Sequence, residues 1–200
     1  MSKFAVTLAD LRKAGACFSG YNKVVRMLQG RPFTAADAER DSYIRLAHKA
    51  PISLADIARN NGLDDALWSL RCVSNADRDM RLFAVWCARQ VEHLMPDERS
   101  RAALNVAERF ANGCATVEEL DAAARAAYAA YAAYAAADAA YAAYAARAAY
   151  AAAAAHVARA ARAAYAAYAA HAAYAAANAV RADQLEMFID MCNGEAFWQS

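Results

Sequence analysis

The chain contains little that interrupts a helix. Only six glycines and three prolines occur among its 200 residues, and none of them falls between Ala122 and Arg181. No segment alternates apolar and polar residues with a period of two, the pattern expected of a half-buried strand. These absences argue against a sheet-based fold, and we predict an all-α protein.

The chain has only five cysteines, which are widely spaced and include no Cys-x-x-Cys pair. This spacing argues against a disulfide framework or a zinc site and favours buried, reduced thiols. The first residues also lack the apolar core of a signal peptide. We therefore expect a cytoplasmic protein. Its formal net charge of +1 provides no general attraction to nucleic acid.

Long apolar runs without a polar residue are missing as well. Arg147, Arg159 and Arg162 interrupt the longest alanine-rich stretch. A membrane-spanning helix needs about 20 consecutive, predominantly apolar residues. We therefore predict no membrane partner.

No combination of residues indicates an enzyme. The sequence has no glycine-rich phosphate loop and no pair of carboxylates at a recognised catalytic spacing. Cys87 and His93 are expected on one helix but, six residues apart, they would not share a face. We predict no catalytic residues, no cofactor and no metal site.

Glycine, proline and capping residues divide the first part of the chain into short helices. The two best capping signals are Thr34 with Asp37 and Thr116 with Glu119. Gly15 and Gly20 are expected to bracket a break between helices. We predict helices at Thr7–Ala14, Tyr21–Gln29, Thr34–Lys49, Leu54–Asn60, Leu63–Val73, Asp77–Met95 and Asp97–Asn112.

The most distinctive segment is built of alanine, with a tyrosine or polar residue at nearly every third position from Ala122 to Arg181. Alanine is the best helix former, so we predict helix here. Three residues fall about 60° short of a full turn, so the large side chains move around the helix and form no coiled-coil seam. Alanine permits close backbone approach, and we expect this helix to pair with another helix.

These patterns predict three parts. Residues 1–115 form a helical head, residues 116–193 a long Ala/Tyr-rich helix or helical hairpin, and residues 194–200 a short tail.

Residues Ser53–Val73 have some features of a DNA-binding helix-turn-helix, including Gly62 at the turn. Asp64 and Asp65 would begin the second helix, where they would repel phosphates. A plain helical hairpin therefore explains this segment better. The two aspartates suit the first turn of a helix because of the helix dipole.

Several short segments resemble a family of phage and bacterial immunity proteins, whose members join a helical amino-terminal region to Ala-rich repeats. The segments that carry the resemblance are Leu11, Ala14, Ala16-Cys17, Gly20-Tyr21, Ala47-His48-Lys49, Asn61–Trp68 and Leu70-Arg71-Cys72. The resemblance implies a protein that neutralises a toxin or excludes a competing phage by binding. It transfers no individual functional residue.

The leading hypothesis is therefore a non-enzymatic protein-binding module, immunity-like, with a protein partner. Exposed Tyr and Arg dominate binding energies at protein interfaces. The predicted partner-binding residues are Tyr131, Tyr141, Tyr144, Arg147, Arg159, Arg162, Tyr165 and Tyr168. The same tyrosines could instead seal the helix onto the head or onto a second copy. Two alternatives stay open: a nucleic-acid-binding protein that uses the basic Arg/Tyr helix, and a structural, self-assembling homo-oligomer.

Overall fold

The computed structural model describes residues 3–136, 148 and 177–200, and these residues form an almost entirely helical structure. The all-α prediction is confirmed. Two two-residue strands, β1 (Ala5–Val6) and β2 (Ile52–Ser53), pair antiparallel, with Ala5 opposite Ser53. The sequence reading missed these strands because two residues are too few to show a period of two.

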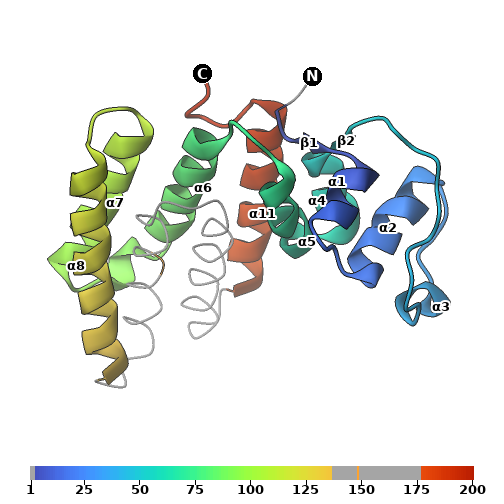
Figure 1. Cartoon of the computed structure of the whole chain (residues 1–200). Coiled ribbons are helices and arrows are strands. Elements are labelled where there is room, and N and C mark those ends of the chain that lie inside the picture. The colour runs from blue at the N-terminus through green and yellow to red at the C-terminus, as the bar shows by residue number, and fades with distance from the viewer. Residues whose placement is uncertain (1–2, 137–147, 149–176) are drawn as a thin grey trace.

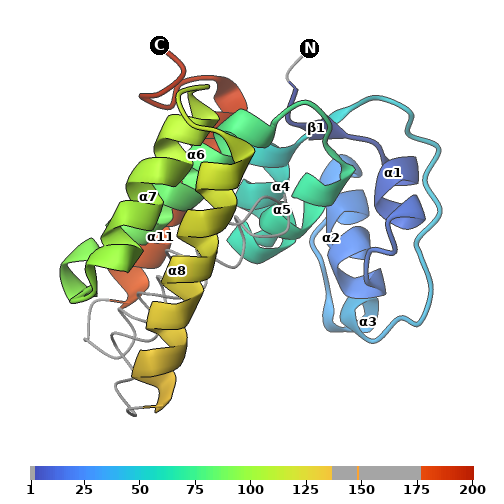
Figure 2. The same cartoon turned by 60° about the vertical axis from the view of Figure 1, so that its left-hand side comes forward.

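The described helices form a row in space that does not follow the order of the chain (Figure 1). Helix α8 packs on α7, α7 on α6, α6 on α11, α11 on α4, and α4 on both α2 and α5. Figure 2 shows the same row from another side, with α11 behind α6 and α7. The bounds are α1 Leu8–Lys13, α2 Phe18–Leu28, α3 Ala35–Ala38, α4 Leu54–Asn61, α5 Leu63–Ser69, α6 Asp77–Arg89, α7 Glu98–Ala111, α8 Val117–Ala136 and α11 Ala177–Asn193.

Side-chain caps account for where most of these helices begin. Thr7 and Thr34 form capping boxes with Asp10 and Asp37, and the Thr116 box with Glu119 precedes α8 as predicted. In the Thr7 and Thr34 boxes, Asp occupies the position at which the motif usually has Glu or Gln. Two 3-10 turns, Leu70–Cys72 and Glu92–Leu94, follow α5 and α6.

Three predicted helices have the wrong length. Helix α2 begins at Phe18, so Gly20 lies inside it and marks no break. The helix predicted to Lys49 ends at Ala38, because the Asn22 side chain of α2 holds the following loop instead. Helix α6 ends at Arg89, and the chain turns at Val91, whose φ of −114° is not helical. Cys87 and His93 therefore do not share a helix.

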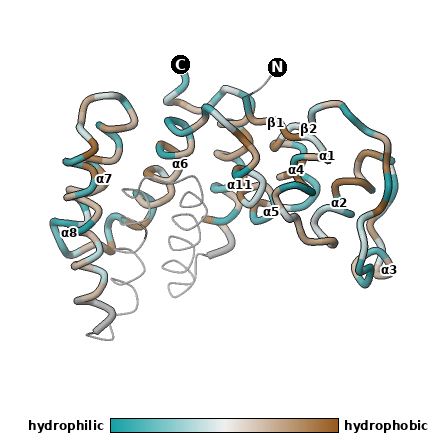
Figure 3. Tube along the Cα trace, viewed as in Figure 1, coloured by the Kyte–Doolittle hydropathy of each residue, from teal (hydrophilic) through white to brown (hydrophobic). Residues whose placement is uncertain are grey.

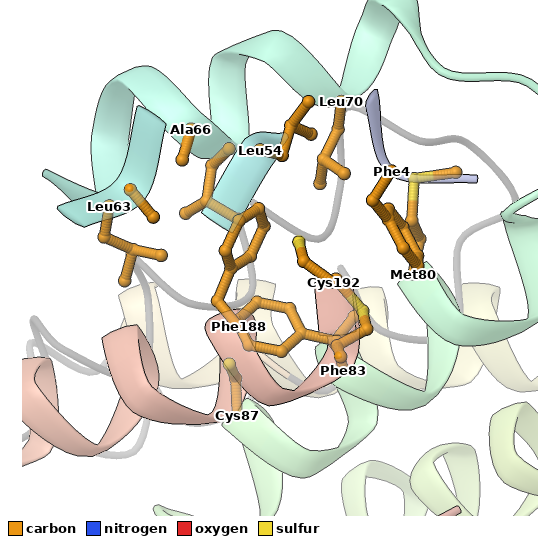
Figure 4. Close-up of a cluster of buried hydrophobic side chains, with 14 of the residues drawn as sticks. Phe4, Leu54, Leu63, Ala66, Leu70, Met80, Phe83, Cys87, Phe188 and Cys192 are labelled. Atoms are coloured by element: carbon orange, nitrogen blue, oxygen red, sulfur yellow. The ribbon is translucent and has the colours of Figure 1, made fainter. Parts of the chain in front are cut away.

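The core draws on both ends of the chain. Figure 4 shows Phe188 and Cys192 of α11 pointing toward Phe83 of α6 and Leu54 of α4. The rings of Phe83 and Phe188 meet edge to face, with centroids 5.7 Å apart. Figure 3 shows hydrophobic stretches in α2, α4 and α6, the helices that neighbour this core.

The described part of the Ala/Tyr-rich segment is helical and paired, as predicted. Helix α8 buries Leu120, Ala127 and Ala130, and α7, on which it packs, buries Ala103 and Ala107. Small side chains let the two backbones approach closely, which explains why the alanines face inward.

The sequence left open whether residues 116–193 fold back as a hairpin or form one continuous, straight helix. Such a helix would place Leu120 and Phe188 about 100 Å apart. Both residues are fully buried in the same core cluster. The two described ends of the segment, α8 and α11, therefore return to one core, and α11 packs among helices of the predicted head.

An ion pair between half-buried Arg26 and buried Asp37 closes the α2–α3 corner and predicts a pH dependence. The Arg26 guanidinium donates to both carboxylate oxygens of Asp37, at 2.6 to 3.1 Å. These hydrogen bonds, with those from Thr34, hold the pKa of Asp37 well below its usual 3.8.

The pair should stabilise the fold at neutral pH and lose its effect in acid. Because the pKa of Asp37 is lower in the folded chain, its contribution is complete above the unfolded pKa and declines as the pH falls below about 5. Asp37→Asn should therefore lose stability at pH 7 and show a flatter acid profile. Urea unfolding from pH 7 to pH 2 tests this, with exposed Asp183→Asn as control. Identical wild-type and Asp37→Asn profiles would contradict it.

Candidate binding cavity

Only one of the eight predicted partner-binding residues lies within the described residues. Tyr131 is half-buried on α8, with its ring centroid 6.0 Å from that of Tyr128. Tyr128 is the more exposed of the two, at 53%. The other seven predictions fall outside the described residues: Tyr141, Tyr144, Arg147, Arg159, Arg162, Tyr165 and Tyr168.

A cavity of about 370 Å³ opens between the first half of α2 and the α4–α5 hairpin. Its volume lies in the range of sites that receive a small molecule or a single large side chain. Leu11, Val24 and Ile57 contribute an apolar lining, and each is almost fully buried. A ligand group that enters this cavity therefore exchanges water for hydrocarbon.

Two aromatic side chains add to this apolar lining. Tyr21 is buried, and its hydroxyl accepts a hydrogen bond of 2.6 Å from Arg12. Trp68 is half-buried, and the Arg71 guanidinium lies 4.2 Å from its ring centroid. The indole thus already stacks with a cation of this chain. Trp and Arg are the side chains that most favour such a cation–π contact.

The polar side of the cavity is organised by Asn61. Its amide nitrogen donates to the Gly20 carbonyl oxygen and to Asp65 Oδ2, both at 2.9 Å, and so ties α2 to α5. Gly20 makes this approach feasible. A Cβ at that position would lie 3.1 Å from Asp65 Oδ2 and 3.2 Å from Cys17 Sγ. Gly20 thus serves helix packing where the sequence suggested a helix break.

The two aspartates of α5 differ in their partners. Asp64 is exposed and forms an ion pair with Arg181 of α11. Asp65 is half-buried, and within the described part of the chain no cation pairs with it. Asp65 therefore gives the cavity an uncompensated negative charge beside apolar and aromatic walls. That combination suits the aliphatic stem and cationic head of a Lys or Arg side chain.

The cysteines divide by exposure. Cys17 caps α2 at the edge of the cavity and is exposed, whereas Cys87 and Cys192 are buried, and burial raises the pKa of both thiols. None of the five cysteines forms a disulfide, but Cys17 and Cys114 are exposed and Cys72 is half-buried, so the prediction of buried thiols is wrong for these three. Within the described residues, no cluster of His, Cys, Asp and Glu could hold a metal ion. The same residues include no helix with the length and hydropathy of a membrane span.

Sequence reasoning did not predict this cavity, although it singled out most of the residues. It named Trp68 only as the end of a resemblance segment and assigned the aspartates to the helix dipole. The aspartates do lie in the first turn of α5. The available signal was the resemblance itself, because Ala16-Cys17, Gly20-Tyr21 and residues of Asn61–Trp68 line the cavity together.

Comparisons with protein-family models, with curated proteins and with solved structures return no match for this chain. The resemblance to immunity proteins therefore stays a prediction.

Proposed function

We propose that this chain is a non-enzymatic protein-binding module, immunity-like in its mode of action, that inhibits or excludes by holding a protein partner. The observation that carries the proposal is the cavity between α2 and the α4–α5 hairpin. It collects residues from separate resemblance segments around an apolar pocket that contains the Asp65 carboxylate, with which no cation of the described residues pairs. The partner inserts a Lys or Arg side chain, whose charge complements this carboxylate.

In this proposal the predicted tyrosines and arginines form a second region that contacts the partner. Tyr131 and its neighbour Tyr128 lie on α8, at the far end of the row from α2 (Figure 1). A partner that touches both regions would span several helices.

The test is a pull-down with the tagged full chain from lysate of its natural host, with and without nuclease. Two variants target the cavity. Asp65→Asn removes the charge but keeps an oxygen that accepts from Asn61, and Trp68→Ala removes the indole wall. Asp56→Asn is the matched control, because Asp56 is exposed on α4 outside the cavity.

We expect one protein to be captured by the wild type and by Asp56→Asn, in both nuclease conditions, and to be lost with Asp65→Asn and Trp68→Ala. Equal capture by all variants would place the contact elsewhere. Capture that disappears with nuclease would favour the nucleic-acid alternative, and recovery of the bait alone would favour self-assembly. Each of these three results would contradict the proposal.

A further inference from the structure

A second cavity, on the opposite flank of α2, is lined by four arginines. Its volume is about 670 Å³. Arg12 comes from α1, Arg26 from α2, and Arg40 and Arg45 from the loop between α3 and β2. Among the residues that the structure describes, no aspartate or glutamate lines this cavity.

The charges of these arginines are mostly uncompensated. Arg26 is neutralised by its ion pair with Asp37. Arg12 donates to the Tyr21 hydroxyl, which is a neutral partner. Arg40 and Arg45 are exposed and form no ion pair with any described residue. Three guanidinium groups therefore keep their positive charge around one concave surface, and such a surface concentrates anions.

The loop that presents Arg40 and Arg45 is held in place by two side chains, buried Asn22 and half-buried Tyr43. Asn22 is fully buried in α2; its amide nitrogen donates to the Ser42 carbonyl oxygen at 3.0 Å, and its amide oxygen accepts from the Ile44 backbone N–H at 2.8 Å. The Tyr43 hydroxyl donates to the Ala16 carbonyl oxygen at 2.6 Å, and its ring packs on Tyr21 with centroids 4.6 Å apart.

This anchoring explains why the loop is not the helix that the sequence predicted. It also lowers the entropic cost of binding, because the backbone between the two arginines is ordered before a ligand arrives.

We infer that the arginine cavity binds a small anion that carries a diphosphate group. Guanidinium groups match phosphate oxygens through paired N–H donors, and several such groups suit an anion with several charges on neighbouring phosphates. A small anion fits within a cavity of about 670 Å³, whereas a long polymer would extend beyond it. This inference does not rest on the proposed function, because the two cavities share no lining residue.

The inference is tested by isothermal titration calorimetry of the full chain with pyrophosphate, ADP, adenosine and a single-stranded oligonucleotide. We expect pyrophosphate and ADP to bind and adenosine not to bind. Arg40→Ala/Arg45→Ala should weaken the binding of both diphosphates by at least about tenfold, since each charge-assisted hydrogen bond is worth at least about one decade in affinity.

A control pair removes the same charge elsewhere. Arg59→Ala/Arg99→Ala alters two exposed arginines on α4 and α7, each paired with an aspartate outside the cavity. It should change the affinity by less than about twofold, since long-range charge effects are screened by salt. Arg40→Lys/Arg45→Lys keeps the charge but loses the planar fork, and intermediate affinity is expected. This variant also tests the inference if the alanine pair does not fold.

Three results would overturn the inference. The first is no heat of binding with either pyrophosphate or ADP. The second is an equal loss of affinity in the control pair, which would indicate nonspecific attraction. The third is binding of the oligonucleotide alone, which would indicate a nucleic-acid surface.

Discussion

Phe188→Ala is expected to lower the free energy of unfolding by about 3–5 kcal/mol, the usual cost of removing a buried phenylalanine ring. Phe188 is fully buried and packs edge to face on Phe83 (Figure 4). The substitution would leave a void between α11, α6 and α4, the middle of the helical row. Because small domains are stable by only about 5–15 kcal/mol, the loss should shift the urea midpoint strongly.

Phe197→Ala is the matched control for this experiment. Phe197 lies nine residues further along but is 65% exposed. Its replacement should change the free energy of unfolding by less than about 0.5 kcal/mol. Equal small effects of the two substitutions would show that α11 does not lie in the core.

Asp79→Ala is expected to have the second largest effect, a loss of about 2–4 kcal/mol of unfolding free energy. Asp79 on α6 is buried, and its carboxylate accepts hydrogen bonds from Trp198 Nε1 at 3.1 Å and Gln199 Nε2 at 3.2 Å. It also pairs with Lys3. One carboxylate thus holds both ends of the described chain. Hydrogen bonds to a charged group contribute about 1.5–3 kcal/mol each. The net loss is smaller than their sum, because the donors that lose Asp79 can form hydrogen bonds to water instead.

Two measurements check this prediction. Urea unfolding gives the free-energy change, and limited proteolysis reports whether the C-terminal residues are released. Asp77→Ala is the control, because Asp77 is exposed in the first turn of the same helix and should cost at most about 1 kcal/mol. A tail that stays resistant to protease in Asp79→Ala would mean that other contacts hold it.

The local elements that the sequence predicted well are those whose signals lie within one turn of chain. Thr116 and Glu119 cap the start of α8 through reciprocal hydrogen bonds, and Gly113 ends the preceding segment with a φ of +73°. The alanine-rich composition correctly predicted the helix that begins the Ala/Tyr-rich segment, because helix propensity is also a local property. None of these inferences needed knowledge of a distant residue.

The errors share the opposite cause. Gly20 was interpreted as a break because its closeness to Asp65, forty-five residues away, is invisible in sequence. Residues beyond Ala38 leave the helix because Asn22 of another helix bonds their backbone. In both places a tertiary contact overrides a local preference of at most about 1 kcal/mol per residue.

The two cavities illustrate the same limit. The sequence analysis named Asp65 as a residue favoured by the helix dipole and Trp68 only as part of a resemblance segment. The sequence places Arg12 and Arg45 thirty-three positions apart, and nothing local indicates that they face one space. Both cavities form because α2 packs against the α4–α5 hairpin on one side and lies beside these arginines on the other.

The helical class, most capping positions and the helix at the start of the Ala/Tyr-rich segment follow from the sequence alone, because each depends on propensity and short-range hydrogen bonds. The tertiary structure decided the rest. It placed α11 between α6 and α4, brought both chain ends to Asp79, and shaped the two cavities. These features depend on which apolar helix faces pack together. That packing involves residues far apart in the sequence and is set by all the helices at once.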